Sequence, residues 1–337
     1  PYVYADILLF QKQNIGVIKM ISLCVCVYNS EHYLDDLFKS FIKQTRKDFK
    51  VLVVDNNSTD NSIEVISKYK NDLDLRIVKE EKQGIQFARQ KALDEIKTDN
   101  FCFIDSDDVI GDKYIETMYL LIDKYGEDYV TEVCYKVFDD GDTIPSTQIS
   151  SKTKLLNKEK GNCYGYCIYK NKIRQGNLWN KCYFIKVVKA NNITFDERIS
   201  CGEDRLFHDK YINCVKGIAL NFSELYFYRV RTNSLVNNIE RTPIHLKNIM
   251  TERIYIEYVD NVIKKNTRDF IRWSKEKAYL LKKYYHFYLE LNDNNNAEIE
   301  KKEVMKTLMK GLFSFAFYPS AKLNLLLKII LFKKYIK

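Results

Sequence analysis

The feature that most limits the fold of this chain is a regular alternation of short apolar runs with amphipathic stretches between Ile21 and Ile122. Between the runs, apolar side chains recur at helical spacing, as at Leu34, Leu37 and Phe41. Buried strands that alternate with helices predict an α/β fold, in which a mainly parallel, twisted sheet is flanked by helices. The predicted strands are Ile21–Tyr28, Val51–Val54, Leu75–Val78 and Phe101–Ile104.

Polar side chains stand where three of these predicted strands end. They are Tyr28, Asp55 and Asp105. In open α/β sheets, ligands bind beyond the carboxyl ends of the strands. We therefore expect these three side chains to lie along one edge of the sheet, where a binding site forms.

Asp105 opens an unusual cluster of aspartates, FIDSDD, that also contains Asp107 and Asp108. Two like charges about 4 Å apart repel by about 4 kcal/mol near a protein surface, so the cluster needs either solvent or a cation. If the segment stays extended, Asp105 and Asp107 face the same way and offer two hard oxygen ligands to Mg²⁺ or Mn²⁺. The alternative is a solvated acidic turn that caps the following helix, and the pattern taken alone favours this alternative.

Composition excludes several classes of site. The formal charge of +9, with Lys and Arg widely spread, permits an anionic partner, whether nucleic acid, a phosphorylated sugar or a membrane surface. Among these we expect no nucleic-acid partner. The 11 glycines form neither GxGxxG nor GxxxxGK[ST], which argues against a Rossmann dinucleotide site or a P-loop. Nine cysteines without a CxxC motif indicate reduced thiols and a cytoplasmic location.

Seven short motifs occur in a fixed order, and the ordered set resembles the family 2 glycosyltransferases of bacterial polysaccharide synthesis. The resemblance covers roughly Met20–Leu235 and implies a GT-A fold with a Rossmann-like nucleotide-binding half. The motifs are VCVYNSEHYLDDLFKSFIKQT (Val25–Thr45), VVDNNSTDNS (Val53–Ser62), GIQFARQKAL (Gly84–Leu93), FIDSDD (Phe103–Asp108), LWNK (Leu178–Lys181), GEDRLF (Gly202–Phe207) and YFYRVRTNS (Tyr226–Ser234).

The resemblance implies roles for the residues at the predicted sheet edge. Tyr28 and Asp55 match positions that hold the nucleobase and nucleoside. Asp105 and Asp107 match the DxD motif, with Asp105 near the ribose and metal and Asp107 as the direct ligand of Mn²⁺ or Mg²⁺. Arg89 matches a residue that faces the donor site, although a solvated helix residue is an equal alternative. Two positions depart from the pattern: Gln90 replaces a usual Asn and Cys26 a usual Pro.

The GEDRLF motif has two interpretations. Ser200, Gly202 and Glu203 fit a helix capping box, in which Glu203 reaches back to the cap and Asp204 interacts with the helix dipole. The resemblance implies instead that Asp204, together with Glu203, is catalytic, and that Asp204 is the general base for the acceptor hydroxyl. Both interpretations can hold at once, and the complete set of motifs favours a base.

Four residues are candidates for contact with the acceptor or phosphate: Trp179, Lys181, Arg229 and Arg231. The resemblance places Trp179 near the acceptor, where an aromatic face can stack on a sugar, but a buried tryptophan is the usual alternative. Arg229 and Arg231 alternate on a predicted strand, so we expect both on one face. They could bind a diphosphate or an anionic acceptor, and surface charge is nearly as good an explanation.

Beyond the resemblance, the chain divides into an N-terminal extension at residues 1–19, the transferase domain at 20–235 and a helical region at 236–337. The last stretch, AKLNLLLKIILFKKYIK, has five lysines and no acidic residue. With GLFSFAFYP (Gly311–Pro319), it is typical of an interfacial helix on a membrane surface, and an ordinary packed helix is the alternative. Membrane contact would place the protein at the inner face of the cell membrane and would suit a lipid-linked acceptor.

The expected function is inverting transfer of a hexosyl or N-acetylhexosaminyl group from a nucleotide-sugar donor, with UDP favoured, to a saccharide hydroxyl. Two alternatives stay open. A nucleotidyltransferase that makes sugar nucleotides can share the sheet and the acidic site, but it normally has a glycine-rich basic loop where this chain has VYNSEHY. A non-catalytic nucleotide- or sugar-binding module would not need DSDD and GED together.

Overall fold

The computed structural model describes residues 20–158, 176–199, 202–231, 253–258, 261 and 294–312. The chain divides into two compact units, residues 1–239 and 240–337. The predicted domain boundary at residue 235 lies outside the described residues.

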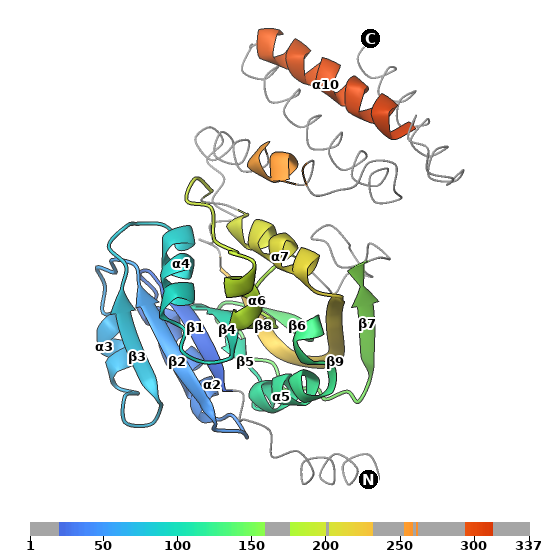
Figure 1. Cartoon of the computed structure of the whole chain (residues 1–337). Coiled ribbons are helices and arrows are strands. Elements are labelled where there is room, and N and C mark those ends of the chain that lie inside the picture. Colours follow the sequence, from blue (N-terminus) through green and yellow to red (C-terminus); the bar gives the residue numbers. More distant parts are fainter. Residues whose placement is uncertain are drawn as a thin grey trace. The chain divides into compact units, whose positions relative to one another are not determined.

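The first half of the sheet in the first unit is parallel, in the order β3-β2-β1-β4 (Figure 1). It matches the four predicted strands. Helices connect its strands, as the alternation in the sequence predicts. The elements are β1 (Ile21–Val27), α2 (Glu31–Ile42), β2 (Phe49–Asp55), α3 (Ser62–Ser67), β3 (Leu75–Lys79), α4 (Ile85–Glu95), β4 (Asn100–Asp105) and α5 (Tyr114–Tyr125).

The second half of the sheet is mixed. β8 continues the sheet antiparallel to β4, β6 is antiparallel to β8, and β9 is parallel to β6. The short strand β5 and the edge strand β7 both pair antiparallel with β9. These elements are β5 (Val109–Ile110), η1 (Gly126–Asp128), β6 (Tyr129–Asp139), β7 (Thr153–Asn157), β8 (Lys181–Phe184), α6 (Ile185–Ala190), α7 (Glu203–Cys214) and β9 (Gly217–Val230).

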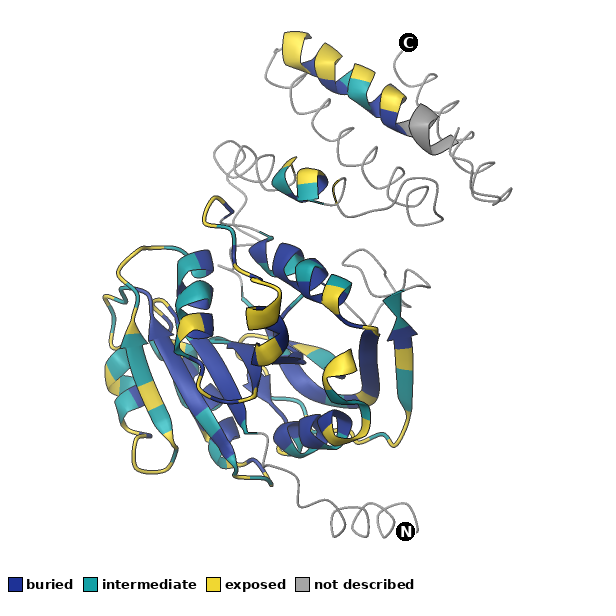
Figure 2. Cartoon of the chain, in the orientation of Figure 1, coloured by how far each residue is buried: buried dark blue, intermediate teal, exposed yellow. Residues whose placement is uncertain are grey.

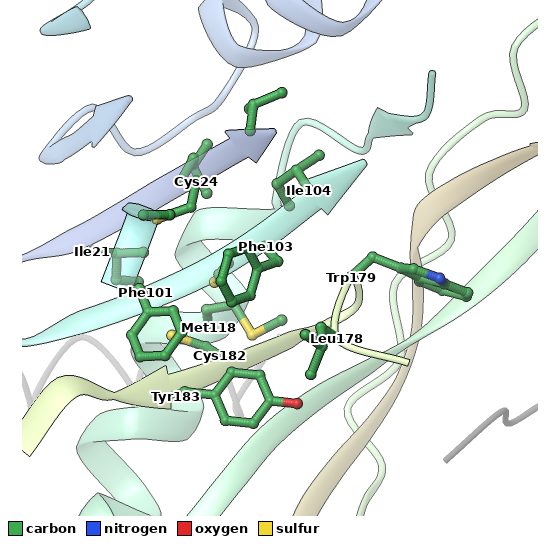
Figure 3. Packing of buried hydrophobic residues seen from close by; sticks show 14 of the residues in the cluster. Ile21, Cys24, Phe101, Phe103, Ile104, Met118, Leu178, Trp179, Cys182 and Tyr183 are labelled. Atoms are coloured by element: carbon green, nitrogen blue, oxygen red, sulfur yellow. The ribbon is translucent and has the colours of Figure 1, made fainter. Parts of the chain in front are cut away.

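The core lies between the sheet and its flanking helices, and Figure 2 shows the central strands as buried. β1 is buried along almost its whole length, as a parallel strand covered on both faces should be. Aromatic side chains join β4 to the second half of the unit. Phe101 stacks on Tyr183 at 5.5 Å between ring centroids (Figure 3). Phe103 meets Phe207 edge to face.

The loops after β1 and β2 are tied to each other. Asn29 and Asn57 adopt left-handed backbone conformations, with φ of 47° and 64°, which asparagine tolerates better than most residues. The Asn29 side chain accepts a hydrogen bond from the Thr59 amide at 2.8 Å, and Asp60 accepts one from the Glu31 amide at 3.0 Å. These contacts hold the carboxyl ends of both strands in place.

In the second unit, the described residues are helical. They comprise a short helix at 253–258 and α10 (Asn294–Leu312). Arg253 forms an ion pair with Glu300 of α10. Within the described ranges, no helix is both long enough and apolar enough to cross a bilayer. The stretch predicted to be interfacial lies outside those ranges after Leu312.

Candidate active site

The three aspartates of the FIDSDD motif diverge in the structure. β4 ends at Asp105, and the chain then turns, with the Asp108 amide donating to the Asp105 carbonyl at 3.2 Å. The segment is therefore not extended, because an extended chain would not bring the amide of Asp108 back to this carbonyl. The condition under which Asp105 and Asp107 would share one face is not met. Each carboxylate instead has its own partner.

Asp108 is fully buried and joins β9 to the turn. It accepts hydrogen bonds from the Tyr226 hydroxyl at 2.6 Å and from the Arg229 backbone amide at 2.8 Å. The same hydroxyl accepts from the Asp105 amide at 3.2 Å. Burial raises the pKa of the Asp108 carboxyl well above its usual range, and the neighbouring aspartates raise it further. No role was predicted for Asp108 or Tyr226, although they belong to the FIDSDD and YFYRVRTNS motifs.

Asp107 lies among arginines. Its carboxylate forms an ion pair with Arg231, 2.7 Å from Nε to Oδ2, and its backbone carbonyl accepts from Arg229 Nε at 2.9 Å. Arg229 also binds Asp36 of α2 at 2.8 Å and Asp140 at 3.2 Å. Burial raises the pKa of Asp107, and the Arg231 charge opposes that rise.

Arg229 near the end of β9 and Arg231 directly after it point to the same side. The guanidinium carbon of Arg229 is 5.4 Å from the ring centre of Tyr33, and that of Arg231 is 5.1 Å from the same ring. The prediction of a shared face is confirmed, whereas surface charge does not describe Arg229, which is only 6% exposed.

Asp105 and Glu203 are bridged by one buried guanidinium. Arg89 donates to Glu203 Oε1 through Nη1, and to Asp105 Oδ1 at 3.2 Å through Nη2. Burial raises the pKa of Asp105 to about 6 and that of Glu203 to about 7, although Arg89 opposes both shifts. Burial disfavours the charged form of Arg89 as well, but the carboxylates outweigh it and raise its pKa. Arg89 is therefore not the solvated helix residue of the alternative prediction.

The capping box predicted at Ser200 and Glu203 is wrong. α7 begins at Glu203, and its N-cap is Gly202 with φ of +81°, a conformation that favours glycine. Ser200 lies outside the described residues. Glu203 is thus the first residue of the helix, and its side chain turns to Arg89 instead of reaching back to a cap. Asp204 follows in the first turn, half-buried, and its carboxylate accepts a hydrogen bond from the Arg205 amide at 2.6 Å.

The residues predicted to bind the nucleoside lie at the same edge of the sheet as Asp105. In the order β2-β1-β4, Val27 is opposite Asp55, and Cys26 is opposite Asp105. Tyr28 follows β1 directly and is 52% exposed. The Asp55 carboxylate accepts from the Ser58 amide at 3.0 Å. The expectation that Tyr28, Asp55 and Asp105 share one edge is met.

Trp179 and Lys181 both lie inside the protein. The indole of Trp179 is 5% exposed and stacks on Tyr226 and Tyr228, 4.6 and 5.5 Å away between ring centroids. Figure 3 shows it beside Leu178, at the border of the core. Lys181 has no exposed side-chain surface and forms an ion pair with Glu132, 3.5 Å from Nζ to Oε1. Both residues pack the second half of the sheet, and their contact with an acceptor stays a prediction.

The site offers hard oxygen ligands to a divalent cation. Within the part of the chain that the structure describes, no three His, Cys, Asp or Glu side chains form a metal-binding cluster. Asp105 and Asp107 carry carboxylate oxygens of the kind that Mg²⁺ and Mn²⁺ prefer, and both cations commonly take further oxygens from phosphate and water. The residues present therefore fit a cation that arrives together with a diphosphate.

The sequence of this chain is similar to that of known proteins. Residues 22–189 match the family described as Glycosyl transferase family 2. Glycosyltransferase GlyA of Streptococcus pneumoniae is 31% identical over 252 residues, which cover 69% of this chain and 34% of that protein. Poly(ribitol-phosphate) beta-N-acetylglucosaminyltransferase TarS of Staphylococcus aureus is 29% identical over 218 residues, covering 62% of this chain and 35% of that protein. The chain spans between about one third and about three quarters of the length of these and other curated relatives.

Solved structures agree on the fold. The crystal structure of residues 1–349 of S. aureus TarS in complex with UDP-GlcNAc aligns with a TM-score of 0.55 at 21% sequence identity, covering 93% of this chain and 81% of that one. At this identity the likeness establishes the GT-A fold alone. Together with the family match, it shows that this chain belongs to glycosyl transferase family 2 and that its described sheet is the GT-A domain of that family.

Proposed function

We propose that the chain transfers a hexosyl or N-acetylhexosaminyl group from a UDP-linked donor to a hydroxyl of a saccharide acceptor, with inversion at the anomeric carbon. The acceptor in this proposal belongs to a cell-surface polysaccharide and is carried on a lipid. The relatives support the UDP-linked donor and a polymeric acceptor, because TarS is a poly(ribitol-phosphate) beta-N-acetylglucosaminyltransferase and its crystal structure holds UDP-GlcNAc.

The observation that carries the proposal is the bridge that Arg89 makes between Asp105 and Glu203. Asp105 belongs to the edge of the sheet where Tyr28 and Asp55 also lie, and Glu203 begins the helix that bears Asp204. The charge of Asp204 is close enough to raise the pKa of Asp105. A candidate donor site and a candidate base therefore lie within electrostatic reach of each other, as transfer between two bound sugars requires.

In this proposal, Tyr28 and Asp55 contact the nucleoside, and Asp107 with Asp105 would hold Mn²⁺ or Mg²⁺. The cation would neutralise the charge that develops on the departing nucleoside diphosphate. Arg229 and Arg231 contact Asp107 and bring positive charge to the place where the diphosphate would bind.

Asp204 is the proposed base. A sugar hydroxyl is a poor nucleophile until a positioned carboxylate removes its proton in the transition state, a contribution worth about 10²–10⁴ in rate. Its neighbour Glu203 is held by Arg89, so the first turn of α7 is fixed relative to β4. Attack on the face opposite the diphosphate would invert the anomeric centre and convert an α-linked donor into a β-glycoside.

Ligand-dependent stability tests the donor site. The purified protein is heated with Mn²⁺ and one of UDP, GDP, dTDP or CMP, alongside Asp107→Asn and a matched control at an exposed aspartate, Asp142→Asn. A nucleotide at a hundred times its dissociation constant should stabilise the fold by about 2.7 kcal/mol. We expect a metal-dependent shift with UDP that is lost in Asp107→Asn and kept in Asp142→Asn. A folded protein that shifts with none of the four nucleotides would contradict the proposal.

We further propose that the lysine-rich C-terminal segment contacts the cytoplasmic membrane surface. Its five lysines and many Leu and Ile side chains support this. Co-sedimentation of the full chain with anionic vesicles, compared with a chain lacking residues 308–337, tests it. Equal sedimentation of the two proteins would contradict membrane contact by this segment.

A further inference from the structure

The carboxylate of Asp107 already has a cationic partner within the protein. Arg231 follows β9 directly, and its Nε lies 2.7 Å from Asp107 Oδ2. The two side chains are 28% and 18% exposed, so solvent reaches the pair but screens it only in part. Any cation that binds this carboxylate must therefore compete with a guanidinium.

The neighbouring arginine is bound in a different way. The guanidinium of Arg229 contacts Asp36, Asp140 and the backbone carbonyl of Asp107, and does not bind the Asp107 carboxylate. It is only 6% exposed. Arg229 thus connects the turn at Asp107 to α2 and to the loop at Asp140. Arg231 instead neutralises the carboxylate of Asp107.

Arg231 also has a contact that does not depend on Asp107. Its guanidinium carbon is 5.1 Å from the ring centre of Tyr33, within the range of a cation–π interaction. If a divalent cation takes the Asp107 oxygen, the two positive charges repel, and the guanidinium must leave that oxygen. The Tyr33 ring can keep it at the site, where a diphosphate would offer the paired oxygens that a guanidinium binds best.

From these contacts we propose that Arg231 is an exchange residue, which pairs with Asp107 when no cation is bound and transfers to the donor diphosphate when the divalent cation binds Asp107. The inference rests on the proposed function, since it assumes a cation and a nucleoside diphosphate at this site. It makes their binding cooperative. A cation that binds alone must displace the Arg231 guanidinium from Asp107, and the guanidinium gains no new partner. When the diphosphate is bound as well, its oxygens pair with the displaced guanidinium.

Removal of Arg231 then has two effects of opposite sign. Mn²⁺ alone should bind more tightly, because its competitor is gone. The gain in Mn²⁺ affinity caused by UDP should shrink, because the diphosphate loses its second partner. Coupling free energies between sites commonly correspond to about 5–150-fold in affinity, so we expect each effect to be about tenfold.

The experiment is a titration of Mn²⁺ with and without saturating UDP, in which free Mn²⁺ is followed by electron paramagnetic resonance. It compares the full-length protein with Arg231→Gln, with Arg229→Gln and with Arg198→Gln, a matched control at an exposed arginine that pairs with Asp196. In Arg231→Gln we expect tighter Mn²⁺ binding without UDP and a smaller enhancement by UDP. In Arg229→Gln we expect weaker binding in both conditions, and in Arg198→Gln no change.

Weaker Mn²⁺ binding by Arg231→Gln without UDP would overturn the exchange, because it would make Arg231 a structural support like Arg229. An unchanged enhancement by UDP would overturn it as well. If the unaltered protein binds Mn²⁺ neither with nor without UDP, the proposed function itself fails, and the exchange fails with it. The behaviour of the unaltered protein therefore separates the two failures.

Discussion

Arg89 and Glu203 are separated by 114 positions in the sequence and form a buried ion pair in the fold. The second amino group of the same guanidinium binds Asp105 at 3.2 Å. One side chain of α4 thus fixes the distance between the end of β4 and the beginning of α7. The proposed donor and base residues stand on these two elements.

Loss of Arg89 should destabilise the fold strongly. Arg89→Met leaves the buried carboxylate of Glu203 and the partly exposed carboxylate of Asp105 without their counter-ion. Breaking a buried pair in this way costs about 3–5 kcal/mol. Arg76→Met is the matched control, because Arg76 pairs with Glu95 while 44% exposed, and such surface pairs contribute about 1 kcal/mol or less. Urea unfolding of both variants measures the difference. If both variants lost the same free energy of unfolding, the buried ion pairs of Arg89 would contribute no more than the exposed pair of Arg76.

The stability of the fold should depend on pH through the carboxyl group of Glu203. Burial raises the pKa of its carboxyl from 4.5 to about 7, so between these values the folded state holds a proton that the unfolded state has released. Stability from this group is therefore present below pH 4.5 and is lost as the pH rises to about 7. The slope is up to roughly 1.4 kcal/mol per pH unit.

The test compares urea unfolding from pH 4 to pH 8 for the unaltered protein, Glu203→Gln and the exposed control Glu81→Gln. The difference in stability between Glu203→Gln and the unaltered protein should shift in favour of the variant as the pH rises. Glu81→Gln should follow the unaltered protein. A parallel course of all three curves would reject the raised pKa of Glu203.

Asp204→Asn should abolish transfer while donor binding survives. The amide cannot accept the proton of the acceptor hydroxyl, and loss of such a base reduces the rate by about 10²–10⁴. UDP release with a saccharide acceptor measures the turnover, and calorimetry with UDP and Mn²⁺ measures the binding. Asp123→Asn, an exposed aspartate on α5, is the control and should keep both. Loss of UDP binding in Asp204→Asn would make Asp204 a structural acid.

Tyr226→Phe should reduce both stability and donor affinity, because the Tyr226 hydroxyl binds the turn that carries Asp105 and Asp108. The change removes the hydroxyl that donates to Asp108 and accepts from the Asp105 amide, while the stacking on Trp179 remains. Leaving a buried acceptor unsatisfied costs about 1–3 kcal/mol. We expect that loss in urea unfolding, together with a severalfold weaker affinity for UDP with Mn²⁺. Tyr129→Phe, which loses only a 3.4 Å hydrogen bond to Asn157, should change neither quantity appreciably.

The sequence by itself determined the four strands of the parallel half and the edge where Tyr28, Asp55 and Asp105 meet. Hydrophobic periodicity is a local property, and the carboxyl ends of parallel strands always share an edge. Alternate side chains of an extended chain point to the same side, so the sequence also predicted correctly that Arg229 and Arg231 lie together. The family resemblance, carried by an ordered set of motifs, was confirmed by the match over residues 22–189.

Only the tertiary structure decided which charges neutralise one another. An extended segment at Asp105–Asp107 and a capping box at Ser200–Glu203 were the arrangements that the local patterns allowed. The structure has a turn at the first place and an N-cap at Gly202 at the second, because contacts with distant residues outweigh the local patterns. Tyr226 reaches Asp108 across 118 positions, and Arg89 reaches Glu203 across 114. A buried carboxylate needs a partner wherever the fold can bring one, and the free energy of leaving it unpaired exceeds any preference that neighbouring residues in the sequence express.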